Sequence, residues 1–166
     1  MIEEMPTNDH LSVKAKIEDW LDAEGISFDQ IQDLNSFFHI VANLKNVPIH
    51  INESKVRRGV LVLLGILGLS EDQLYKIGKF SPEDGESLFQ SLFAMLDKSE
   101  YLFLLQKDFA MQNWLKVQRT LYIEDLTRTN LLTEMKDLNM KLVNVNYRVN
   151  ETLKRFAPLS DAESYK

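Results

Sequence analysis

Residues 37–51 read FFHIVANLKNVPIHI and contain two apolar runs separated by the pair Lys45-Asn46. The second run places an apolar residue at every other position, as a half-buried strand does. A two-residue gap between such runs predicts a β-hairpin, and Asn46 tolerates the positive φ that its turn needs, although Lys45 suits it less well. We therefore expect antiparallel strands at residues 37–44 and 47–51.

The segments on either side of this hairpin predict a helix and a further strand. Residues 12–24 place apolar side chains at helical spacing and are followed by Gly25, a residue typical of helix C-termini. Residues 28–34 alternate only weakly and give a weak strand candidate. Residues 59–69 are almost wholly apolar and hold three glycines, which favours a central strand buried on both faces over a helix.

The next stretch carries two helix start signals. Ser70 precedes two acidic residues, and Ser81-Pro82 precedes two more, which is the pattern of an N-cap followed by acids in the first turn. We expect a short helix after Ser70 and a longer one after Pro82. Residues 101–106 then predict a strand, and residues 114–126 predict a helix.

A final helix is predicted from Thr127 or Thr129 to about residue 156, and a disordered tail after Pro158. Its apolar residues recur at alternating spacings of three and four, which is the seam of a coiled coil. The seam residues are Leu131, Met135, Leu138, Leu142, Val145, Val149, Leu153 and Phe156. We expect this seam to pack against the 114–126 helix as a helical hairpin, against a second subunit, or against both.

The order of these elements predicts an α+β fold, with an antiparallel sheet of four to five strands packed by helices. We expect residues 1–110 to form the α+β core. Residues 111–166 are expected to form a C-terminal helical hairpin, as a two-helix extension that packs on the core or on a second subunit.

Composition excludes several classes of function. The chain has 166 residues, a net charge of −6 and no cysteine, so disulfides, zinc thiolate sites and cysteine nucleophiles are excluded. The first ten residues lack the pattern of a signal peptide, and the longest apolar stretch is about half of what spans a bilayer. We expect a cytoplasmic protein that binds neither membrane nor nucleic acid, with Lys55, Arg57 and Arg58 as a solvated strand end.

Two histidines are candidates for a metal site. If Leu44 pairs with Val47, His50 lies opposite Val41, and His39 is its diagonal neighbour on the same face. A metal site needs a third ligand, and Glu53 falls on the other face, so we expect no metal. His10 lies in the predicted N-terminal tail without a visible partner.

No other pattern predicts catalysis. The acidic pairs Glu71/Asp72 and Glu83/Asp84 are explained by their place in first helical turns, and Glu124/Asp125 has no cleft assigned to it. The glycines of residues 59–69 do not have the spacing of a phosphate-binding loop. We expect no catalytic residue, no metal and no cofactor.

The order and character of several segments resemble a known family. Residues 17–25, 37–41, 69–74 and 80–83, followed by a tail that opens near residue 122, resemble an archaeal family of domains of unknown function. The fold of that family is similar to bacterial type III secretion chaperones, which are small acidic α+β dimers that bind an extended segment of a client protein. The chain departs from those chaperones in its long helical tail beyond Met111, and the resemblance brings no catalytic residues.

These observations predict a non-enzymatic, chaperone-like or adaptor module that forms a homodimer and binds a protein segment. The expected partner-binding residues are Phe37 and Val41, together with Val47 and Ile49 at the edge of the 47–51 strand. We expect them to bind the segment by sheet-edge addition or in a hydrophobic groove. The alternative is a small-ligand-binding protein or an enzyme with an unrecognised site, which predicts a pocket where polar groups converge.

Overall fold

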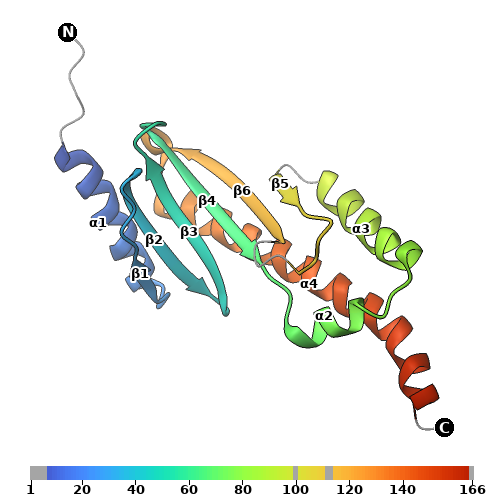
Figure 1. The fold of residues 1–166 in the computed structure, drawn as a ribbon. Helices are drawn as coiled ribbons and strands as arrows, with labels where there is room; N and C mark the ends of the chain where they lie inside the picture. Colours follow the sequence, from blue (N-terminus) through green and yellow to red (C-terminus); the bar gives the residue numbers. More distant parts are fainter. Residues whose placement is uncertain (1–6, 99–100, 111–113, 165–166) are drawn as a thin grey trace. The chain divides into compact units, whose positions relative to one another are not determined.

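The computed structural model describes the backbone of residues 7–98, 101–110 and 114–164, and the side chains of residues 10–98, 101–110 and 114–155. It has an α+β fold, as predicted (Figure 1). In chain order the elements are α1 (Thr7–Ala23), β1 (Phe28–Gln30), β2 (Ser36–Leu44), β3 (Val47–Ser54), β4 (Val60–Leu67), α2 (Glu71–Ile77), α3 (Pro82–Asp97), β5 (Leu102–Leu105), β6 (Leu115–Tyr122), the 3-10 helix η1 (Ile123–Asp125) and α4 (Arg128–Ser164).

The strands form one six-stranded antiparallel sheet in the order β1-β2-β3-β4-β6-β5. The sheet therefore has one strand more than the upper limit predicted from the sequence. Strand β3 lies between β2 and β4, so the expectation that residues 47–51 form an exposed edge is wrong. The edges belong to the short strands β1 and β5, and short edge strands offer few unpaired backbone groups for unwanted pairing.

The β2–β3 hairpin has the register predicted from the sequence. Leu44 pairs with Val47, and Val41 pairs with His50. Lys45 and Asn46 both have positive φ, at 52° and 67°, which is the backbone of the two-residue turn that matches strand twist. Lys45 therefore adopts a conformation that its residue type disfavours, because the paired strands on both sides hold it there.

The chain divides into two compact units, which we describe separately. The first unit comprises Met1–Gly65 and Gln118–Asn139, and the second comprises Ile66–Val117 and Met140–Lys166. This division does not follow the predicted boundary between residues 110 and 111, because β4, β6 and α4 each contribute residues to both units.

The first unit has its core on one face of the sheet. Alternate residues of β2, β3 and β4 are buried, as the period of two requires. Helix α1 and the first turns of α4 contribute further buried side chains of this unit, among them Ile17, Leu21 and Met135. The Asn139 amide donates a hydrogen bond to the Leu44 carbonyl at 2.9 Å, which ties α4 to the turn of the hairpin.

The second unit is built around α2, α3 and the later part of α4. Ser70 and Gln73 form a capping box at α2, and Ser81 caps α3 with Pro82 in its first turn, so both predicted start signals are confirmed. The Gln73 amide, which is buried, donates to the side-chain oxygens of Asn146 at 3.0 Å and Asn150 at 2.9 Å. Neutral amides thus join α2 to α4.

The helix predicted at residues 114–126 is wrong, because β6 and η1 occupy that segment. Within β6, the buried residues Leu115 and Val117 alternate with half-buried polar ones, which is a strand pattern. The helical hairpin predicted for residues 111–166 is therefore absent from the described part of the chain.

The long final helix is confirmed, and α4 continues to Ser164, through the segment predicted to be disordered. Its seam is buried within a single chain, so burial of these residues does not require a second subunit. The buried seam residues are Leu131, Met135, Leu138, Leu142, Val145, Val149 and Leu153. The side chain of the eighth, Phe156, lies outside the described side chains. In the described residues, no helix combines the length and the apolar character needed to cross a bilayer.

Candidate functional site

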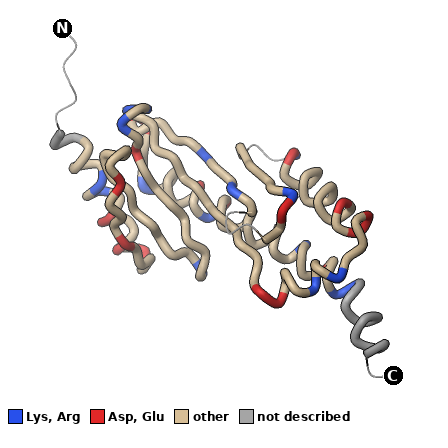
Figure 2. The backbone as a smooth tube through the Cα atoms, in the orientation of Figure 1, with Lys and Arg blue, Asp and Glu red and all other residues tan. Residues whose placement is uncertain are grey.

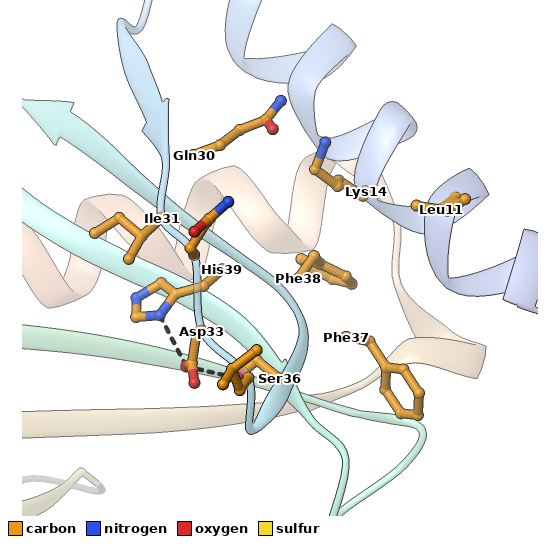
Figure 3. Close-up of a pocket in the computed structure, with 11 residues that line it drawn as sticks. Leu11, Lys14, Gln30, Ile31, Asp33, Ser36, Phe37, Phe38 and His39 are labelled. Atoms are coloured by element: carbon orange, nitrogen blue, oxygen red, sulfur yellow. Dashed lines mark hydrogen bonds and ion pairs between the residues drawn. The ribbon is translucent and has the colours of Figure 1, made fainter.

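The first unit contains an open cleft of about 520 Å³ beside α1, β2 and the loop that joins β1 to β2 (Figure 3). Several of its apolar side chains are exposed: Leu34 at 90%, Leu11 at 53% and Ile31 at 42%. The lining residues are Leu11, Lys14, Gln30, Ile31, Gln32, Asp33, Leu34, Ser36, Phe37, Phe38 and His39.

A β-bulge lies at Phe37 on β2. Ser36 pairs with Ser54 and Phe38 pairs with Glu53, so Phe37 is the extra residue on β2. Ser36 and Phe38 are both buried, whereas Phe37 is half-buried and lines the cleft. Bulges are over-represented next to functional sites.

His10 holds the start of α1 against the same end of the sheet. Its ring stacks on Phe37 with centroids 3.6 Å apart, and its Nδ1 lies 2.8 Å from Glu53 Oε1. The second oxygen of Glu53 accepts a hydrogen bond from the Gly59 N–H at 2.9 Å. Both His10 and Glu53 are buried, and a buried carboxylate requires such partners.

The expectation that His10 lies in a tail without a partner is wrong, because α1 begins at Thr7. The sequence carried a signal for this earlier start. His10 precedes the buried Ile17 and Leu21 by seven and eleven residues, which places all three on one helical stripe.

The loop between β1 and β2 is organised by Asp33. Its carboxylate accepts hydrogen bonds from the Ser36 hydroxyl at 2.7 Å and the Asn35 N–H at 3.0 Å, and it lies 3.2 Å from His39 Nδ1. These interactions, with the Ser36 hydroxyl first, hold the pKa of Asp33 below its ordinary value. The loop therefore presents Leu34 to solvent from a fixed turn.

His39 and His50 form a hydrogen-bonded pair on the face of the sheet opposite the core. His39 Nε2 lies 2.8 Å from His50 Nδ1, which confirms the predicted diagonal contact. An ionised Asp33 orients a proton on His39 Nδ1, so neutral His39 can accept from His50 through Nε2. Burial, and then the charge of His39, lowers the pKa of His50. The chain Asp33–His39–His50 could pass a proton along its length.

This arrangement does not make a metal centre. Both ring nitrogens of His39 are already engaged, one by Asp33 and one by His50. Within the described ranges of the chain, no group of three or more histidine, aspartate or glutamate side chains is placed to hold a metal ion.

The predicted partner-binding residues do not form one surface. Phe37 lines the cleft, and Val41 and Val47 are half-buried elsewhere on the hairpin. Ile49 is fully buried, so its assignment to an exposed surface is wrong; by alternation it lies on the core face of β3.

Sequence reasoning missed Leu11 and Leu34 as surface residues of the cleft. Leu34 follows an aspartate and precedes an asparagine, which marks a turn and therefore an exposed apolar side chain. That local signal was present, but the position of Leu11 beside the same loop depends on the packing of α1.

Comparisons with known proteins agree with the family predicted from the sequence. A family model described as "Uncharacterized conserved protein (DUF2299)" matches residues 13–147. No curated protein matches the sequence closely enough to count as a relative.

Among solved structures, an uncharacterised protein from Methanothermobacter thermautotrophicus matches with a TM-score of 0.77 and 20% identity, over 85% of this chain and 99% of that one. This likeness shows a shared fold, with an archaeal protein as predicted.

Two further matches involve chaperones. The HopA1–SchA chaperone–effector complex gives a TM-score of 0.48, 15% identity, and coverage of 82% of this chain and 94% of the other. The Yersinia pestis type III secretion chaperone SycH, in complex with a fragment of YscM2, matches with a TM-score of 0.47 and 19% identity, over 80% of this chain and 98% of the other. SycH is described as a type III secretion chaperone, the class that the sequence resembled.

Proposed function

The chain belongs to the DUF2299 family of uncharacterised conserved proteins, and we propose that it is a non-enzymatic adaptor whose cleft in the first unit binds a segment of another protein. The observation that carries the proposal is the exposure of Leu34, Leu11 and Ile31 around one cleft. Apolar side chains gathered in an exposed groove are typical of protein-interaction sites.

The polar groups of the cleft favour a protein segment over a small molecule. Asp33 is occupied by Ser36, Asn35 and His39. The Lys14 ammonium lies 3.3 Å from Glu18, a residue that also accepts a hydrogen bond from Gln30. A small-ligand site is expected to aim unpaired polar groups at its ligand, whereas here they bind one another.

The proposal retains Phe37 as a partner-binding residue and adds Leu11 and Leu34. Val41 and Val47 remain predicted partner-binding residues, which a longer bound segment would contact if it continued along the hairpin. The homodimer and the cytoplasmic location expected from the sequence also stay predictions.

A site-specific cross-linking experiment tests the proposal. A photo-reactive residue at Leu34 of the full chain is expected to cross-link a partner from source-cell lysate, and the same residue at the exposed Tyr147 is not. The purified partner should then lose at least tenfold in affinity for the variant Leu11→Asp/Leu34→Asp in calorimetry, and little for Tyr147→Asp. Unchanged affinity in the cleft variant would refute the proposal.

The second candidate function is an enzyme or small-ligand binder, and the Asp33–His39–His50 chain favours it because His39 lines the cleft. It requires a small molecule that contacts His39. Screening metabolites by NMR would decide, because a ligand that shifts the His39 imidazole signals supports this candidate. If no metabolite shifts the His39 signals, and only added protein segments do, this second candidate is refuted.

A further inference from the structure

The turn between β3 and β4 places a cluster of cations beside the cleft. Lys55, Arg57 and Arg58 are exposed there, in a chain whose net charge is −6. Figure 2 shows this stretch as a blue segment at the tip of the β3–β4 hairpin. We call residues 54–59 the basic turn.

Hydrogen bonds fix the basic turn against the cleft. The Lys55 N–H donates to the Asn35 carbonyl at 2.9 Å, so the turn adjoins the loop that presents Leu34. At its other end, the Gly59 N–H is held by buried Glu53, and Gly59 has a φ of +80°, which side chains rarely adopt. The backbone of the basic turn is therefore held beside the loop that presents Leu34.

The basic turn also adds apolar surface of its own. Val56 stands between the cations and is 89% exposed. The Arg58 guanidinium lies 5.5 Å from the centroid of the Phe37 ring, which itself lines the cleft. The basic turn thus combines cations with an exposed apolar side chain, and it contacts both the loop that presents Leu34 and the Phe37 ring.

The cations of the turn are not neutralised within the described structure. None of the ion pairs between described residues involves Lys55, Arg57 or Arg58. Arg58 contacts an aromatic ring rather than a carboxylate. These charges are therefore available to an anionic partner.

From this juxtaposition we propose that the segment bound in the cleft is acidic and amphipathic, with aspartate or glutamate side chains that face the basic turn and apolar side chains that face Leu11, Leu34 and Phe37. The inference rests on the proposed function and narrows its partner class. Complementary charge at the rim of an apolar site raises specificity and the association rate.

Nucleic acid fits the same surface less well. Single-stranded nucleic acid is bound by bases that stack on free aromatic faces. One face of Phe37 is covered by the parallel His10 ring, 3.6 Å away, and the Arg58 guanidinium lies 5.5 Å from the ring centroid, so the ring already contacts two side chains of its own chain. The exposed groups nearby are aliphatic, which suits protein side chains.

The test selects partners without assuming their identity. A phage library of random 12-residue peptides is selected on the full chain, and retained peptides are those that fail to bind Leu11→Asp/Leu34→Asp. We expect these peptides to be enriched in aspartate and glutamate together with leucine, isoleucine, valine or phenylalanine.

The leading peptide then serves as the probe in fluorescence anisotropy. The variant Lys55→Gln/Arg57→Gln is expected to weaken its binding about fivefold, because exposed ion pairs contribute modestly. Replacing the acidic residues of the peptide by glutamine should weaken binding by a similar factor. The two changes together should weaken binding no more than either change alone, because both remove the same ion pairs. The matched control Lys98→Gln/Arg155→Gln changes the net charge equally in the second unit and should leave affinity unchanged.

The outcomes separate the two proposals. This inference is overturned if the cleft-dependent peptides show no acidic enrichment, or if they bind Lys55→Gln/Arg57→Gln as tightly as wild type. The proposed function would still stand in either case. Failure to select any cleft-dependent peptide counts against both. Three other occupants are tested with the same variant: a second copy of the chain, a 12-nucleotide RNA and phosphatidylserine vesicles. If Lys55→Gln/Arg57→Gln loses one of these interactions but still binds the peptide, the basic turn is assigned to that occupant instead.

Discussion

The two units differ in the chemical type of the buried polar side chains that join their helices and strands. The first unit buries His10 against the carboxylate of Glu53, and it contains every histidine of the chain. The second unit instead joins its helices through the neutral side chains of Gln73, Asn146 and Asn150. Among the residues whose side chains are described, the buried ionisable groups His10 and Glu53 therefore lie in the unit that also carries the cleft and the basic turn.

The physical consequence is that the two units should respond differently to substitution and to pH. A buried charge that loses its partner is costly, because the desolvation of the remaining charge is no longer offset. A buried amide that loses a partner costs less, because it carries no net charge. Each of the following predictions tests one side of this comparison.

The largest effect is expected at Glu53. Glu53→Ala should lower the free energy of unfolding by about 3 kcal/mol, because it leaves buried His10 and the Gly59 N–H without their acceptor. Glu53→Gln should cost less, because one amide oxygen still accepts. Urea denaturation followed by circular dichroism measures both.

The control for Glu53→Ala is Glu86→Ala, which removes an exposed carboxylate from α3. Its free energy of unfolding should stay within about 0.5 kcal/mol of the wild-type value. If Glu53→Ala cost no more than this control, the buried pair would not stabilise the first unit.

A smaller effect is expected at Gln73 in the second unit. Gln73→Ala should lower the free energy of unfolding by about 1.5 kcal/mol, because Asn146, Asn150 and the Ser70 N–H each lose a neutral hydrogen bond. Gln90→Ala is the matched control, since Gln90 is exposed and bonds only to Glu86 among the contacts described for it. A cost at Gln73 as large as that at Glu53 would remove the distinction between the units.

Much of the fold could be predicted because its signals are local. The hairpin register follows from a two-residue gap between alternating runs, and the starts of α2 and α3 follow from Ser70 and from Ser81-Pro82. The seam of α4 is a repeat within one helix. Each of these patterns depends on residues close together in the chain.

The errors arise where distant segments decide the outcome. Residues 115–122 begin with a local strand signal, because buried Leu115 and Val117 alternate with polar residues, but their place between β4 and β5 is set by segments distant in the chain. The same holds for the site. His39 and His50 could be paired from the hairpin alone, whereas the contact of His10 with Glu53 joins residues 43 positions apart.

The smallest predicted effect concerns pH and His50. Its pKa lies below the ordinary histidine value, mainly through burial and further through the charge of His39. As pH falls below about 6.5, the unfolded chain binds a proton that the folded chain resists, so stability should fall. The loss should continue until the pH reaches the lower pKa of the folded state. The lowered pKa of Asp33 acts separately, because its contribution is lost only below about pH 4.

His50→Gln should reduce this loss between pH 7 and pH 5, because glutamine keeps a polar group beside His39 but does not titrate. Hydrogen exchange at the two pH values, corrected for intrinsic rates, would locate the effect. Amides of β2 and β3 should lose protection at pH 5 in wild type and less so in His50→Gln, while those of α3 should change little, since the second unit has no histidine. An equal loss of protection in α3, or an unchanged loss in His50→Gln, would show that the pH response does not arise from the histidine pair.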